Sequence, residues 1–76
     1  MKVGDTFELV GGNYQYKILD LWEGYEDGRQ HLPVTMGKLH RLKTNGQVVK
    51  SEKPIVRVVK FKYGGPELLN GRVIKN

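Results

Sequence analysis

The run from Ile55 to Tyr63, Ile-Val-Arg-Val-Val-Lys-Phe-Lys-Tyr, is the densest block of β-branched and aromatic residues in the chain. Such residues favour strands because their side chains pack well on a pleated, half-buried surface. Strict alternation gives the second half of the run one apolar and one cationic face, which are Val59, Phe61 and Tyr63 against Lys60 and Lys62. Arg57 breaks the pattern because it falls on the apolar face. The run therefore predicts either a central strand that is apolar on both faces or a bulge near Arg57.

The first part of the chain indicates an antiparallel hairpin. Residues Val3 to Val10 alternate in the manner of a strand, and Gly11-Gly12-Asn13 supplies residues that tolerate a tight reversal. Tyr14 to Trp22 follows as the second strand. Two inward-facing sets are compatible with this strand, namely Tyr16 and Ile18, or Leu19 and Leu21 after a bulge.

A second hairpin is expected around Thr44-Asn45-Gly46, because Asn-Gly between two strand-like runs is a strong turn signal. It would join the strand Val34 to Lys43 to the residues Gln47 to Lys50. Gly37 interrupts the first of these segments, and a glycine inside a strand predicts a bulge or a sharp bend.

Near the C-terminus, Pro66 to Gly71 has an early proline and a late glycine, which predicts one short helical or 3₁₀ turn. Arg72 to Lys75 is then expected to return as a closing strand beside the first one. With a long polar loop at Glu23 to Pro33, this layout resembles the SH3-like small barrels. The resemblance implies an all-β, mainly antiparallel fold of five to six strands, and an OB-like barrel is the alternative. Neither architecture by itself implies a function.

The size and composition predict one small domain spanning residues 1–76. The chain contains no cysteine, which excludes disulfides and thiol chemistry and favours a reducing, cytoplasmic setting. The N-terminal residues lack the apolar core of a signal peptide, and no apolar run approaches the roughly 18 residues needed to span a bilayer. We expect a cytoplasmic protein without membrane association that is complete from its initiator Met.

No arrangement of residues typical of catalysis is present. Ser51 and the scattered threonines lie on no nucleophile or phosphate-loop motif, and His31 and His40 are nine residues apart without neighbouring ligands. The carboxylates Glu23, Glu26 and Asp27 crowd the polar loop, where such groups are usually solvated. We therefore expect a non-enzymatic protein with no catalytic residues, metal site or cofactor.

Charge is distributed unevenly along the chain. Residues 1–33 contain three Lys or Arg and six Asp or Glu, whereas residues 34–76 contain ten Lys or Arg and two Asp or Glu. Cations on adjacent strands and turns would form a basic face that binds phosphates and releases counterions. The expected nucleic-acid-binding residues are Lys38, Arg41, Lys43, Lys50, Lys53, Lys60 and Lys62. Binding of DNA or RNA through this basic strand face is the first functional hypothesis.

The second hypothesis is a protein-protein interaction module, such as the small inhibitors of host proteins found among phage and mobile-element products. A compact domain with opposite charges on its two halves would dock on one acidic protein partner, with an aromatic anchor. The expected contact residues, in and beside the polar loop, are Trp22, Tyr25, Arg29 and His31. The protein is expected to be a monomer or a homodimer.

Overall fold

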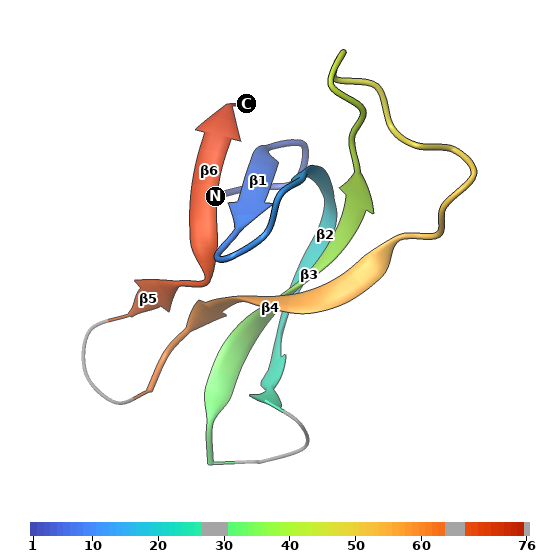
Figure 1. The fold of residues 1–76 in the computed structure, drawn as a ribbon. Helices are drawn as coiled ribbons and strands as arrows, with labels where there is room; N and C mark the ends of the chain where they lie inside the picture. Colours follow the sequence, from blue (N-terminus) through green and yellow to red (C-terminus); the bar gives the residue numbers. More distant parts are fainter. Residues whose placement is uncertain (27–30, 64–66, 76) are drawn as a thin grey trace.

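The computed structural model describes residues 1–26, 31–63 and 67–75. They form one antiparallel sheet in the order β5-β4-β3-β2-β1-β6 (Figure 1). The strands are β1 (Thr6–Leu9), β2 (Gln15–Tyr25), β3 (Pro33–Arg41), β4 (Ile55–Phe61), β5 (Leu68–Leu69) and β6 (Gly71–Lys75). The all-β, antiparallel prediction is confirmed. The described residues contain no α-helix, and the sheet is open rather than closed into a barrel, with β5 and β6 at its edges.

The main core cluster is small and lies on one face of the curled sheet, while Val34, which is also fully buried, lies on the opposite face. Phe7, Ile18, Leu39 and Val59 are fully buried and contact one another, so each of the first four strands contributes one side chain. Partly buried residues surround them, namely Leu9, Tyr16, Leu21, Ile55 and Val73. Complete burial of an aliphatic or phenyl side chain contributes about 1.5–3 kcal/mol, so these four residues supply much of the stability available to a chain of this length.

Two bulges switch the alternation of side chains along the long strands. In β2 the register shifts between Ile18 and Asp20, so Leu19 is the extra residue. Both inward-facing sets expected for this strand are therefore partly right, because Ile18 is buried before the bulge and Leu21 packs on the core after it. In β4 the shift leaves Val59 as the extra residue, so the predicted bulge exists but lies two residues beyond Arg57.

The bulge in β4 divides the apolar face that alternation predicted for this strand. Val59 enters the main core, whereas Phe61 pairs with Val34 on the opposite face of the sheet. Phe61 also contacts the ring of Tyr63 edge-on, with ring centroids 5.7 Å apart. Arg57 is exposed and donates a hydrogen bond to the carbonyl oxygen of Val56 at 2.8 Å, so its side chain does not enter the core.

Gly37 does not form the predicted bulge or bend. The ladder runs without a shift through its pairs with Leu21 and Arg57. A Cβ atom at Gly37 would lie 2.8 Å from Val59 Cγ1. Glycine at this position therefore makes room for the side chain that the β4 bulge pushes into the core.

The C-terminal segment differs from the expected helical turn. Leu68 and Leu69 form β5 and pair with Phe61 and Lys60 of β4, because the backbone groups at this edge of β4 are available for a ladder. Pro66 itself lies outside the described residues. The closing strand is confirmed, since β6 pairs antiparallel with β1.

The polar loop is shorter than predicted. β2 continues through Glu23 to Tyr25, and β3 already begins at Pro33, which is paired with Tyr25. The residues 27–30 lie outside the described part of the chain. Trp22 is 39% exposed. It pairs with Met36 on the face opposite the core, because the bulge at Leu19 has reversed the alternation.

Candidate nucleic-acid interface

The connection between β3 and β4, residues Leu42–Pro54, is here called the basic loop. It starts with the predicted turn, in which Gly46 has a φ of 87° and its amide donates to the Lys43 carbonyl at 2.9 Å. The predicted hairpin after this turn consists of a single bridge between Leu42 and Val48. The buried Val49 anchors the middle of the loop, since its carbonyl accepts a hydrogen bond from His40 Nε2 at 2.9 Å. The loop is thus held against the end of β3 at its midpoint, whereas its turn is closed by hydrogen bonds within the loop.

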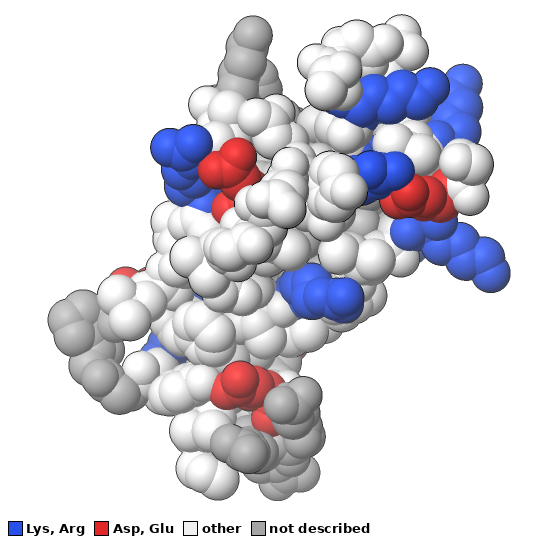
Figure 2. All heavy atoms as spheres, in the orientation of Figure 1, with Lys and Arg blue, Asp and Glu red and all other residues white. Residues whose placement is uncertain are grey.

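The basic loop carries three exposed lysines, Lys43, Lys50 and Lys53. Its one acidic residue, Glu52, binds Arg41 at the end of β3. Within the described part of the chain the three lysines form no ion pair, so their charges are not neutralised by a carboxylate. Figure 2 shows Lys and Arg side chains gathered at the end of the molecule where Figure 1 places this loop.

Arg41 is held between Glu52 and Tyr14. Its Nε donates to Glu52 Oε1 at 2.9 Å, and its Nη2 donates to Glu52 Oε2, so the ion pair is bidentate. The guanidinium carbon lies 4.6 Å from the centroid of the Tyr14 ring. The hydrogen bonds to Glu52 raise the pKa of Arg41 above its ordinary value, and desolvation only partly opposes this. Arg41 thus positions an aromatic ring beside the basic loop.

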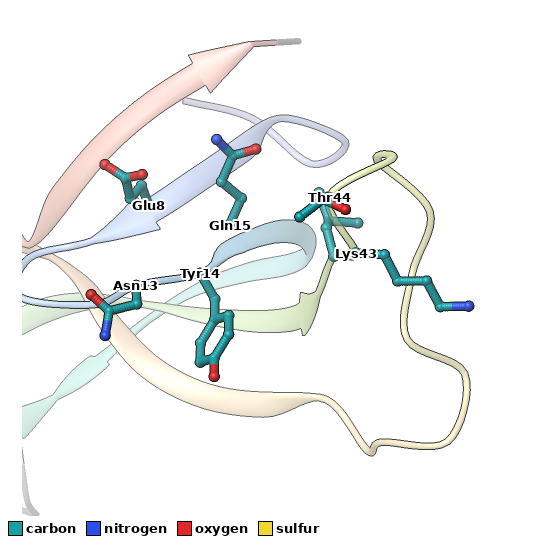
Figure 3. A pocket seen from close by; sticks show the side chains of 7 residues that line it. Glu8, Asn13, Tyr14, Gln15, Lys43 and Thr44 are labelled. Atoms are coloured by element: carbon teal, nitrogen blue, oxygen red, sulfur yellow. The ribbon is translucent and has the colours of Figure 1, made fainter.

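A hollow of about 260 Å³ lies between the start of β2 and the start of the basic loop. Its lining residues are Glu8, Asn13, Tyr14, Gln15, Leu42, Lys43 and Thr44. In Figure 3 the side chains of Asn13 and Tyr14 extend to one side of the chain, and those of Glu8 and Gln15 extend to the other. The hollow is therefore lined by neutral hydrogen-bonding groups, an aromatic ring and one lysine, while Glu8 is occupied by an ion pair with Arg72.

Lys38 lies on the outer face of the sheet, opposite the core. It pairs with Asp20 on one side and Val56 on the other, and it is exposed. Lys17 was not singled out by the sequence, yet it pairs with His40 on the same face, next to the basic loop. The cross-strand register is what brings Lys17 to this end of the sheet.

Lys60 and Lys62 lie far from the basic loop, near the hairpin that joins β2 to β3. Lys60 pairs with Thr35, which is on the opposite face of β3 from Lys38. Lys60 forms an ion pair with Glu67 at 2.6 Å, and Lys62 forms one with Glu23. The hydrogen bond from Lys60 lowers the pKa of Glu67, and the charges of both lysines add to this. These two lysines therefore do not share one cationic face with Lys38.

The expected protein-contact residues are only partly brought together. Trp22 and Tyr25 are exposed on β2, and His31 is exposed just before β3. Arg29 lies outside the described residues. Trp22, Met36 and Val58 are directly opposed across three strands, which gives the outer face an apolar row.

Neither a cluster of metal-ligating residues nor a membrane-spanning helix is present in the described ranges. No group of three or more His, Cys, Asp or Glu side chains is arranged there to hold a metal ion. No helix in those ranges has the length and apolarity required to cross a membrane.

Tyr14 is the candidate functional residue that sequence reasoning missed. It precedes β2, whereas Arg41 and Glu52 are more than twenty-five residues away in the chain. The pairing of Tyr16 with Arg41 brings the three side chains together. Comparison of the chain with protein-family models, with curated protein sequences and with solved structures found no match, so the function is inferred from this geometry alone.

Proposed function

We propose that this protein binds nucleic acid through the basic loop. The observation that carries the proposal is that Lys43, Lys50 and Lys53 are exposed and form no ion pair with any carboxylate among the described residues. Three of the other predicted cations, Arg41, Lys60 and Lys62, are ion-paired. Unpaired lysines on one projecting segment attract phosphate oxygens and release condensed counterions when they bind. Lys38 extends this surface onto the outer face of the sheet.

The proposal is tested by the salt dependence of binding to a labelled oligonucleotide. Each lysine that contacts a phosphate contributes close to one unit to the slope of log K against log salt concentration. We expect affinity to fall steeply between about 50 and 200 mM salt. The triple variant Lys43→Gln/Lys50→Gln/Lys53→Gln should bind weakly and show a slope smaller by about two to three units.

A matched control is the double variant Lys60→Gln/Lys62→Gln. These lysines belong to the same predicted set but contact Glu67 and Glu23 at the other end of β3. The double variant should keep wild-type affinity within about two-fold, because it removes no unpaired charge from the loop. Absence of oligonucleotide binding at low salt, or equal losses in the two variants, would refute the assignment to the basic loop.

The second candidate function is protein binding, and the apolar row Trp22, Met36 and Val58 on the outer face, of which Trp22 is exposed, favours it. Tryptophan is a frequent anchor of protein interfaces because it buries a large surface at little entropic cost. If this row is the contact surface, the wild-type protein should retain a partner from nuclease-treated lysate. The Trp22→Ala variant should fail to retain that partner, whereas the triple lysine variant should still retain it. Loss on nuclease treatment would argue for the nucleic-acid function instead.

For the architecture, we propose kinship with the SH3-like barrels rather than the OB-like ones. In support, the segment from Leu68 to Lys75 pairs with β4 through β5 and with β1 through β6. Asn70 bridges the two halves, since its amide donates to the Val59 carbonyl and its own carbonyl accepts from the Val10 amide, both at 2.9 Å. Nuclear Overhauser contacts from Asn70 to Val59 and to Val10 test this arrangement. The absence of these contacts would count against it.

A further inference from the structure

Tyr14 offers an aromatic surface that is already fixed in place. Tyr14 is 50% exposed, although the Arg41 guanidinium covers one face of its ring. Glu52 fixes that guanidinium through two hydrogen bonds. Because the ring is oriented before any ligand arrives, little conformational entropy remains to be lost when a planar group stacks on it.

The surroundings of the ring match the chemistry of a nucleotide. Asn13 extends to the same side of the chain as Tyr14 (Figure 3), and its amide both donates and accepts hydrogen bonds. Lys43 and Thr44 line the same hollow, and the remaining lysines of the basic loop follow within ten residues. A base on the ring would thus have a polar neighbour for its edge and cations for its phosphates.

This combination selects among nucleic acids. In a duplex each base is stacked on both faces, so its π-surface is not available to a protein side chain without unstacking. An unpaired base presents its face freely, and proteins that bind single strands use aromatic rings beside cationic grooves in this way. A ring without dense hydrogen-bonding partners tolerates every base, so little sequence preference is expected.

We propose that Tyr14 is a stacking platform for an unpaired base, and that the ligand of the basic loop is single-stranded nucleic acid. The inference rests on the proposed function, because the lysines must bind the backbone for the ring to meet a base. Arg41 and Glu52 act as positioning residues for the ring.

The experiment compares three ligands of equal length, which are a single strand of mixed sequence, its duplex and an abasic single strand. Each is titrated with the wild type, Tyr14→Leu, Tyr14→Phe and Tyr25→Leu. Tyr25 is a matched control because it is 53% exposed, similar to Tyr14, but lies at the opposite end of β2. The fold of each variant is checked by its unfolding transition. If Tyr14→Leu is unstable, the preference of the wild type for the base-bearing over the abasic single strand still tests the inference.

For the single strand, Tyr14→Leu should weaken binding by roughly 5- to 150-fold, the range typical of replacing one base-stacking aromatic by alanine. Tyr14→Phe should bind as the wild type does, because the ring and not the hydroxyl stacks. The duplex and the abasic strand should bind all four proteins alike. Tyr25→Leu should leave every affinity unchanged.

Two results would overturn the inference and leave the proposed function standing. One is that the wild type binds all three ligands with equal affinity and that Tyr14→Leu has no effect. This result would mean that the protein contacts only the sugar-phosphate backbone. The other is an equal loss of all three ligands on Tyr14→Leu, which would mean that Tyr14 only supports the loop. If no ligand binds with a steep salt dependence, the proposed function itself fails.

Discussion

At the scale of single residues, Gly37 and Val59 show how closely two strands depend on each other. Val59 is the extra residue of the β4 bulge and is fully buried, and its Cγ1 occupies the space where a side chain at Gly37 would begin. The backbone of Gly37 is not in the left-handed region. The requirement for glycine is therefore one of volume and not of backbone conformation.

Gly37→Ala should lower the free energy of unfolding by about 1–3 kcal/mol, the usual cost of overpacking a core. Urea denaturation measures this loss. In the double variant Gly37→Ala/Val59→Ala the new methyl group takes the place of Cγ1, one of the two methyl groups that Val59→Ala removes. The double variant should therefore lose less than the sum of the two single losses. Simple additivity would contradict the proposed contact.

Glu67 is a second residue whose behaviour depends on one contact. Lys60 donates to it and lowers its pKa, so the carboxylate is stabilised in the folded state. This contribution to stability is present above the ordinary glutamate pKa and is lost as the pH falls through the lowered folded value. NMR titration of the carboxyl carbon should show the low pKa in the wild type and a return toward the ordinary value in Lys60→Met. Lys38→Met, which removes a lysine from the other face, should leave the Glu67 pKa unchanged.

At the scale of elements, Asn70 connects the two edges of the sheet. It stands between β5 and β6, and its side-chain Nδ2 donates to the Val58 carbonyl at 2.8 Å. Together with its two backbone hydrogen bonds to Val59 and Val10, it fixes the path of the chain from the β4 edge to the β1 edge. The bend between two short strands is thus specified by one polar side chain.

Asn70→Ala should destabilise the fold by about 1–2 kcal/mol, because it leaves a partly buried carbonyl of Val58 without its donor. Chemical denaturation gives the value, and Asn13→Ala, at an exposed asparagine in the first turn, is the control expected to stay within about 0.5 kcal/mol of the wild type. Equal effects of the two substitutions would show that Asn70 has no special role in the bend.

At the scale of the whole molecule, the chain has one principal core and a sheet whose opposite face is partly exposed. Leu39 is fully buried on the core face, whereas Trp22, the larger side chain, is on the outer face. The molecule is also electrically divided along β3. The lysines of the basic loop, which form no ion pair within the described residues, follow its C-terminal end, and ion-paired lysines lie near its N-terminal end.

Leu39→Ala should therefore cost about 2–5 kcal/mol of stability, as is usual for truncation of a buried leucine. Trp22→Ala removes more atoms but should cost clearly less, because the indole is already in partial contact with water. Thermal and urea unfolding followed by far-UV circular dichroism compare the two variants on the same scale. A larger loss for Trp22→Ala would mean that the outer face is a second core.

Local signals in the sequence were sufficient for the strand content, the Asn45-Gly46 turn, the first hairpin and the closing strand. β-branched runs and turn residues act over a few positions, so their effect is visible without the fold. The basic character of the second half of the chain was equally apparent, because it depends only on composition.

Only the tertiary structure decided where the bulges lie, that Leu68 and Leu69 form a strand, and which cations pair with carboxylates. Alternation along Ile55 to Phe61 is reset by one extra residue, and a one-residue change of register moves every later side chain to the other face. The pairs Lys62 with Glu23 and Arg41 with Glu52 then follow from that register and from loop packing. The same long-range pairing sets Tyr14 beside Arg41, because contacts between residues distant in sequence are fixed by the packing of the whole sheet.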